Sequence, residues 1–127
     1  FTPRASIDYS FGDTSNTLVY ASYAQGYRAG GFNGRGQSAA GARTPFDPET
    51  VDTFELGLKT EFLDNRVTLN VAAFLSKFNN KQEEIVRPAP PPAGQETVVL
   101  NAATATIKGL EAEFRALLVE GLTVNGS

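Results

Sequence analysis

Apolar and polar residues alternate with a period of two along most of this chain, in segments separated by clusters of turn residues. Such alternation is typical of β-strands, because successive side chains of a strand point to opposite faces of a sheet. Clusters of Gly, Pro, Asn and Asp mark where one strand ends and the next begins. The pattern predicts six strands, at about residues 4–11, 17–28, 50–62, 67–78, 102–116 and from 122 onward. An extension of the fourth strand toward residue 86 is an alternative.

The predicted connections alternate in length. Short turns are expected at residues 12–16, 63–66 and 119–121, and long loops at residues 29–47 and around the Pro-rich tract 88–92. Transmembrane β-barrels are built in this way, with short periplasmic turns and long outer loops. Structureless loops beyond about 15 residues are uncommon in compact soluble domains. We therefore predict an all-β, antiparallel, up-and-down segment of a transmembrane barrel.

The turn between the third and fourth strands sets a testable register. A two-residue turn at positions 64–65 would pair Phe62 with Val67 and, further along, Thr53 with Ser76. One face of the hairpin is then mainly apolar, and the other carries Glu, Lys, Asn and Thr side chains. A slip of one residue would mix these faces, so the register is strongly specified.

The apolar face is expected to contact lipid and the polar face a water-filled interior. In the fifth strand, this assigns Leu110, Ala112 and Phe114 to the lipid face. We interpret the charged row on the interior face as a hydrated wall, in preference to an acid–base catalytic pair. The row comprises Glu55, Lys59, Glu61, Glu111, Glu113 and Arg115. A membrane accepts only a closed barrel, and six strands are too few to close a wide one.

Composition excludes several functional classes. Cys and His are both absent, so disulfides and Ser–His–Asp or Cys–His catalysis are excluded within these residues. No metal site, no cofactor and no enzymatic activity are expected. A net charge of -3 without a basic stripe argues against a nucleic-acid partner. No apolar run reaches the ~20 residues of a transmembrane helix. No signal peptide starts at Phe1, which we interpret as the mark of a piece of a larger protein.

Several stretches closely resemble barrel segments of TonB-dependent outer-membrane receptors. They are residues 20–33 (YASYAQGYRAGGFN), 46–59 (FDPETVDTFELGLK), 70–74 (NVAAF) and 108–113 (KGLEAE), and residues 1–4 (FTPR) resemble the opening of an earlier strand. The order of these motifs is that of the family, and the resemblance covers nearly the whole chain. It implies that residues 1–127 are a partial barrel domain, about six strands of a 22-stranded barrel that encloses a plug domain.

The resemblance implies a transport function for the whole protein. Members of the family import scarce nutrients, most often ferric siderophores, across the bacterial outer membrane with energy relayed by TonB. The implied partners are outer-membrane lipid, lipopolysaccharide, a small-molecule substrate and the TonB complex, the last through a plug domain that these residues lack. Two alternatives stay open. One is a passive porin-like or structural outer-membrane barrel, and the other is a soluble β-sandwich binding module.

Six residues at or near the predicted outer loops are candidates for ligand binding. Aromatic rings can stack on a chelate, and Arg offers a planar fork for carboxylates or catecholates. Lipopolysaccharide contact, loop solvation and an aromatic girdle are the alternatives. For Tyr20 and Tyr23 we favour the girdle or barrel packing. The candidates are Tyr27, Arg28, Phe32, Arg35, Arg43 and Arg87.

Overall fold

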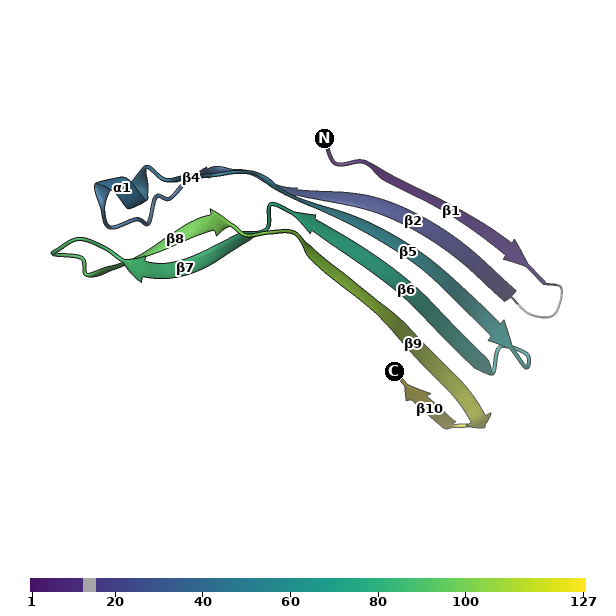
Figure 1. The fold of residues 1–127 in the computed structure, drawn as a ribbon. Helices are drawn as coiled ribbons and strands as arrows, with labels where there is room; N and C mark the ends of the chain where they lie inside the picture. Colours follow the sequence, from purple (N-terminus) through teal and green to yellow (C-terminus); the bar gives the residue numbers. More distant parts are fainter. Residues whose placement is uncertain (13–15) are drawn as a thin grey trace. The chain divides into compact units, whose positions relative to one another are not determined.

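The structure, a computed structural model, describes residues 1–12 and 16–127 (Figure 1). The predicted short turn at residues 12–16 therefore lies mostly outside the described residues. The described part of the chain forms ten strands and one short helix. In chain order they are β1 (Arg4–Phe11), β2 (Asn16–Arg28), β3 (Gly31–Phe32), α1 (Ala39–Ala42), β4 (Pro45–Phe46), β5 (Glu49–Phe62), β6 (Val67–Asn79), β7 (Gln82–Pro88), β8 (Gln95–Asn101), β9 (Ala105–Val119) and β10 (Leu122–Gly126).

Six of these strands form one antiparallel sheet in the order β1-β2-β5-β6-β9-β10. Each strand lies beside the preceding long strand of the chain, so the predicted all-β meander is confirmed. The first three predicted strands agree with β1, β2 and β5 to within one residue. The fifth is shifted, because β9 begins at Ala105 and continues to Val119.

The predicted two-residue turn joins β5 to β6. The amide of Arg66 donates to the carbonyl of Leu63 at 3.1 Å. Leu63, Asp64 and Asn65 have φ angles of 55°, 54° and 62°, so the left-handed backbone of the turn extends one residue beyond the two central positions of a type I′ turn. Asp and Asn tolerate this region better than most residues. The Thr53 and Ser76 hydroxyls lie 3.0 Å apart, as the predicted register requires.

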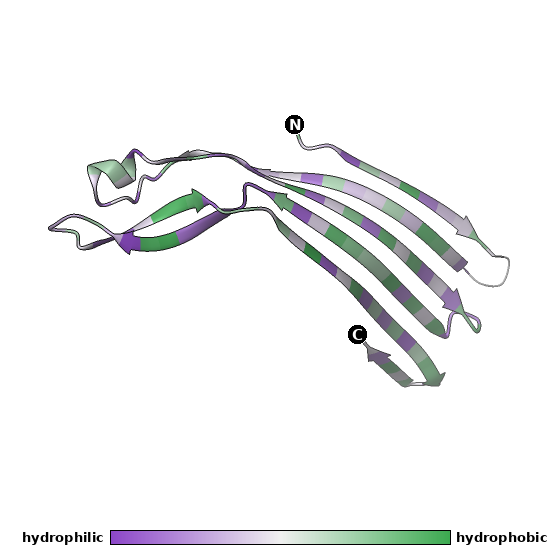
Figure 2. Cartoon of the chain, viewed as in Figure 1, coloured by the Kyte–Doolittle hydropathy of each residue, from purple (hydrophilic) through white to green (hydrophobic). Residues whose placement is uncertain are grey.

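The sheet has an apolar face that nothing in the described residues covers. β1 and β2 pair with Ile7 opposite Ala21 and Tyr9 opposite Val19. Ile7 is 72 % exposed and Leu110 on β9 is 73 % exposed. Bands of apolar and polar residues alternate along β5, β6 and β9 (Figure 2). A single-layered sheet of this kind leaves on its surface the apolar area that a soluble protein would bury.

Aromatic side chains on the polar face cover glycines of the neighbouring strand. A Cβ atom at Gly57 would overlap the ring of Tyr20, and one at Gly109 would overlap the ring of Phe74. Glycine in a strand often marks such a close approach. Tyr20 therefore packs within the barrel wall, which is one of the two roles, girdle or barrel packing, that we favoured for it.

The chain forms two compact units. The sheet unit comprises Phe1–Ala24, Thr53–Ser76 and Ile107–Ser127, and the loop unit comprises Gln25–Asp52 and Lys77–Thr106. No helix in the described part of the chain is long and apolar enough to cross a membrane.

The second long connection is not the irregular Pro-rich loop that we predicted. β7 and β8 form a hairpin whose register runs from Gln82 opposite Asn101 to Pro88 opposite Gln95. The alternative of a longer fourth strand is also wrong, because β6 ends at Asn79 and Asn80 has a φ of 52°. The prolines lie at or beyond the strand ends, where no ladder hydrogen bond is lost.

The first long connection also has structure of its own. The short strands β3 and β4 pair with Gly31 opposite Phe46 and Phe32 opposite Pro45. Helix α1 lies between them and is capped by Ser38, whose hydroxyl accepts from the amide of Gly41 at 2.8 Å. Serine is a preferred residue at this position of a helix.

Candidate functional site

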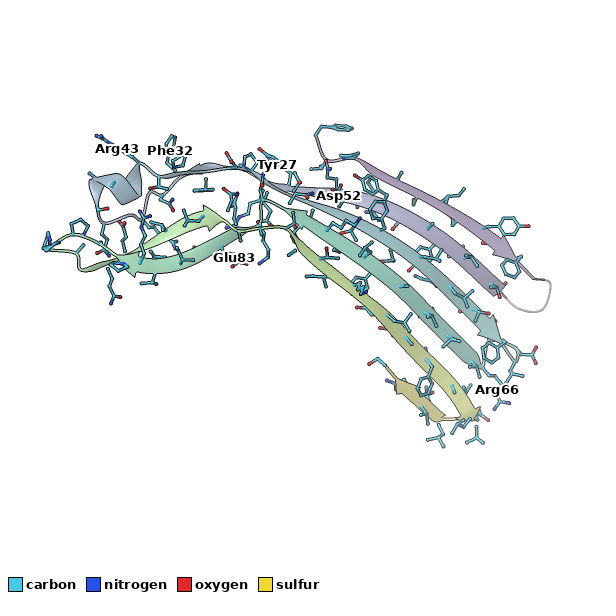
Figure 3. All side chains as sticks on the ribbon, in the orientation of Figure 1. Tyr27, Phe32, Arg43, Asp52, Arg66 and Glu83 are labelled. Carbon is cyan, nitrogen blue, oxygen red and sulfur yellow. The ribbon has the colours of Figure 1, made fainter. Side chains whose placement is uncertain are left out.

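The six predicted ligand residues all lie in the loop unit. Most have exposed side chains, and Arg87 is half-buried. Arg43 and Phe32 project to the same side of the loop unit in the view of Figure 3. By position, Tyr27 and Arg28 end β2, Phe32 ends β3, Arg35 lies in the turn that follows, Arg43 caps the C-terminus of α1, and Arg87 lies in β7.

Phe32 and Arg35 share one pocket. It has a volume of about 170 Å³ and includes Phe46 and Val98 in its apolar lining. Val98 is 1 % exposed and is the only hydrophobic side chain among the described residues that is buried. Pockets for whole drug-sized ligands are larger, roughly 300–1,000 Å³. This pocket can therefore hold one ring or side arm of a ligand, not a complete chelate.

The rim of this pocket carries one cation and one anion. An Arg35 guanidinium nitrogen lies 3.9 Å from a carboxylate oxygen of Glu84, and both side chains are largely exposed. Ion pairs of this exposed kind contribute little, about 0–1 kcal/mol. Arg35 can therefore exchange Glu84 for an anionic ligand at small cost.

A buried side-chain amide, that of Asn33, lies between Phe32 and Arg35 in the chain. Asn33 is 4 % exposed, and its Nδ2 donates to the carbonyls of Thr44 at 3.0 Å and Val99 at 2.9 Å. Its Oδ1 accepts from the amide of Val99. The Asn33 side chain thus pairs with both backbone groups of one residue in β8, as a neighbouring strand would.

A buried carboxylate links the same two segments. Glu96 is 3 % exposed. It accepts from the amide of Ser38 at 3.1 Å and from the Ser38 hydroxyl at 2.8 Å. Its other oxygen accepts from Nε of Arg87 at 3.0 Å. The Ser38 hydroxyl, helped by the Ser38 amide and Arg87 and opposed by burial, lowers the pKa of Glu96 below its ordinary value. Arg87, one of our candidates, is therefore engaged with Glu96.

Two further amides join the bases of the long connections. Nε2 of Gln82 donates to the carbonyls of Ala29 and Asp47, each at 3.0 Å. Nδ2 of Asn101 donates to the carbonyls of Asp47 at 2.9 Å and Asn80 at 2.7 Å. We did not predict a role for Asn33, Gln82, Glu96 or Asn101, because nothing local in the sequence marks them as buried or bridging.

The polar face of the sheet unit holds part of the predicted charged row. The hydroxyl of Tyr20 donates to Glu55 at 2.7 Å, and Nζ of Lys59 lies 5.8 Å from the centre of the Tyr20 ring. These three residues line a hollow of about 190 Å³ together with Glu111 and Glu113. In the described part of the chain, no three acidic residues form a group that could hold a metal ion.

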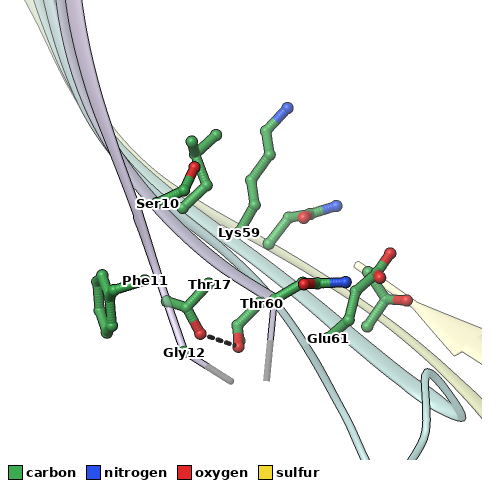
Figure 4. A pocket seen from close by; sticks show the side chains of 11 residues that line it. Ser10, Phe11, Gly12, Thr17, Lys59, Thr60 and Glu61 are labelled. Carbon is green, nitrogen blue, oxygen red and sulfur yellow. Dashed lines mark hydrogen bonds between the residues drawn. The ribbon is translucent and has the colours of Figure 1, made fainter. Parts of the chain in front are cut away.

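A second hollow of the sheet unit lies where β1, β2 and β5 approach their short connections. It has a volume of about 640 Å³, and its lining includes Lys59 and Glu61. The hydroxyls of Thr17 and Thr60 lie 2.8 Å apart beside it (Figure 4). Its lining includes none of the six candidate ligand residues.

Comparison with known proteins relates all of the chain to one family. The family model described as TonB dependent receptor-like, beta-barrel matches residues 1–127. The chain is 30% identical over 125 residues to the ferric-pyoverdine 358 receptor of Pseudomonas putida, which covers 97% of the chain and 14% of that protein. It is 35% identical over 80 residues to a probable TonB-dependent siderophore receptor, PiuA, of Acinetobacter baumannii, covering 60% of the chain and 11% of that protein. The chain thus spans a small part of the length of these curated relatives. No solved structure matches it.

Proposed function

This chain belongs to the TonB-dependent receptor β-barrel family, and from that premise we propose that the receptor it contributes to binds a ferric siderophore and imports it across the bacterial outer membrane. The family consists of outer-membrane receptors and transporters, not enzymes, and its members bind siderophores and interact with TonB. Two relatives are themselves named as a ferric-pyoverdine receptor and a probable siderophore receptor.

One observation carries the choice of an anionic chelate as substrate. The loop unit presents the ring of Phe32 and the guanidinium of Arg35 at one pocket, while Arg28 and Arg43 are exposed on the same unit. A ferric siderophore is usually anionic, and an Arg fork can bind its carboxylate or catecholate oxygens with two hydrogen bonds. The pocket is large enough for one arm of such a ligand.

The other partners follow from the faces of the sheet. We place lipid against the apolar face that carries Ile7 and Leu110. The long connections of such barrels belong to the outer side, and there lipopolysaccharide phosphates would compete for the arginines of the loop unit. Contact with TonB is assigned to the plug domain of the whole receptor.

The direct test is uptake by the full-length receptor in a strain that lacks it. Radiolabelled ferric pyoverdine, a ferric tris-catecholate and a ferric tris-hydroxamate are supplied under iron limitation. We expect at least one to be taken up, and R35A to weaken its binding by roughly tenfold through loss of a charged hydrogen bond.

R35K and R66K form a matched pair of controls. Lysine keeps the charge of Arg35 but lacks the planar guanidinium fork, so the affinity of R35K for the chelate should lie between those of wild type and R35A. Arg66 lies in the β5–β6 turn of the sheet unit, so R66K should bind as wild type does. Binding of none of the three chelates by a correctly inserted receptor would contradict the siderophore assignment.

A further inference from the structure

The two long connections are held together by buried polar side chains, and we propose that this makes them one preassembled recognition element. Asn33 and Glu96 are its positioning residues, and they act on the ligand through Phe32 and Arg35. We call the group formed by Asn33, Ser38, Glu96 and Arg87 the interloop clasp. The proposal rests on the ligand site proposed above and adds to it the means by which that site is held in shape.

The first connection cannot hold its own shape. Its strands β3 and β4 have two residues each and α1 has four. Helices so short are unstable in water without tertiary contacts, and an isolated two-stranded hairpin is marginal. The hairpin of β7 and β8 is longer, with seven residues in each strand. The first connection therefore depends on the second for its conformation.

Glu96 supplies the first link across the two connections. One carboxylate oxygen takes both hydrogen bonds of Ser38, at the start of α1, and the other takes that of Arg87 on the neighbouring strand. A Cβ atom at Gly41 would overlap this carboxylate. The first turn of α1 is thus shaped to receive Glu96, and a side chain at position 41 would push it out.

Asn33 supplies the second link and lies closer to the ligand site. Its side chain is fastened to Thr44 in its own connection and to Val99 in the other. The carbonyl of Asn33 also accepts from the amide of Gly36 at 2.9 Å, which closes the turn that carries Arg35. Phe32 directly precedes Asn33 and Arg35 follows it by two residues, so the backbone that carries both side chains is held in place.

Such fixing has a consequence for binding. A ligand that binds to an ordered loop does not have to order it. The binding free energy is then not reduced by the cost of ordering the loop, so the affinity is higher. Loosening the clasp should weaken binding even though neither Asn33 nor Glu96 need touch the ligand.

Two spin labels test whether the connections move together. The 127 residues contain no Cys, so A40C on α1 and V86C on β7 can be labelled in the full-length receptor once other cysteines are replaced. Both positions are exposed. We expect a narrow distance distribution in lipid nanodiscs. E96A and G41A should broaden it, whereas E96Q should leave it narrow because glutamine keeps the shape of the side chain and an oxygen that can accept from Ser38. The matched control is E83A, an exposed glutamate of the same hairpin. A broad distribution without any substitution would overturn the proposal.

A double-mutant cycle tests positioning, using whichever chelate of the three-member panel binds most tightly. N33A alone should weaken binding by roughly tenfold, and R35A should have little further effect in that background, because its side chain is no longer held in place. Additive effects of N33A and R35A would contradict a positioning role. G41A provides a second way to loosen the clasp without altering Asn33.

The two proposals fail in different ways. Wild-type binding by both F32A and R35A would contradict the ligand contacts, and with them the positioning role. The label distances would still show whether the connections form one element. Outer-membrane insertion, measured by heat-modifiable mobility, separates every variant from a failure to fold.

Discussion

At the residue scale, the close approach of strands depends on glycines that face aromatic rings. A Cβ atom at Gly57 would overlap Tyr20, whereas one at Gly34 would meet no atom within 4 Å. We expect G57A to destabilise the barrel by about 1–3 kcal/mol, the usual effect of overpacking. Thermal unfolding of the full receptor in detergent measures this, with G34A as the neutral control. The double substitution Y20A/G57A should lose less stability than the sum of the two single substitutions, and equal effects of G57A and G34A would contradict the packing.

Also at this scale, the clasp should respond to acid through Glu96. The pKa of this carboxyl is held below its ordinary value of 4.5, first by the Ser38 hydroxyl. Because the pKa of Glu96 is lower in the folded protein, the carboxylate stabilises the clasp fully at any pH above the ordinary pKa. This stabilisation is lost as the pH falls through the lowered pKa of the folded state. We expect the distance distribution of the A40C/V86C labels to stay narrow from about pH 7 to about pH 5 and to broaden only in stronger acid. E96Q should remove this response, and an unchanged response would show that another group titrates.

Residue roles divide clearly into those that local sequence could predict and those it could not. Phe32 and Arg35 were chosen as ligand candidates because an aromatic ring and a cation in a Gly-rich connection suggest a contact surface, and their role in binding stays a prediction. Glu96 and Glu83 are both glutamates in strand-like surroundings, yet one is buried and bridging and the other is exposed. The difference comes from Ser38, far away in the chain, and no local pattern contains it.

At the element scale, the turn between β5 and β6 is a sensitive point. Asp64 and Asn65 both have positive φ angles, and glycine at the second central position is favoured in such turns. N65G should therefore be neutral or stabilising, by up to about 1 kcal/mol. D64P should impair assembly strongly, because proline fixes φ near −65°. The fraction of heat-modifiable, inserted receptor measures both, and efficient assembly of D64P would contradict the left-handed conformation of Asp64.

Strands in which apolar and polar residues alternate could be predicted from the sequence. Elements whose local sequence shows no such alternation could not. The strands of the sheet alternate between an apolar and a polar face, which is why β1, β2 and β5 were placed to within a residue. The hairpin of β7 and β8 was missed although Ile85, Val86 and Val98 favour strands. Its proline tract dominated the local pattern, and its hydrogen bonds to the first connection join residues that lie far apart in the chain.

At the scale of the whole chain, the exposed apolar face decides the environment. Side chains such as Ile7, Leu56 and Leu110 are more than half exposed, and burying apolar surface is worth about 25 cal/mol per Å². We expect the isolated 127-residue chain to aggregate in plain buffer and to be dispersed by detergent, which light scattering measures. A monodisperse, cooperatively melting monomer without detergent would support the soluble-sandwich alternative instead.

The last prediction separates an energised receptor from a passive pore of the same architecture. The loop unit binds ligand from outside in our proposal, and this step is a spontaneous equilibrium that needs no energy from the inner membrane. Passage through the barrel requires the plug to be moved, which the family achieves through TonB. Deleting tonB should therefore abolish uptake of the preferred chelate while leaving its binding to intact cells unchanged. R35A should show the opposite pattern, with weaker binding but uptake that recovers at high chelate concentration, because the transport step itself is intact. Uptake that persists without TonB would favour the porin-like alternative, since diffusion through an open barrel does not depend on the inner membrane.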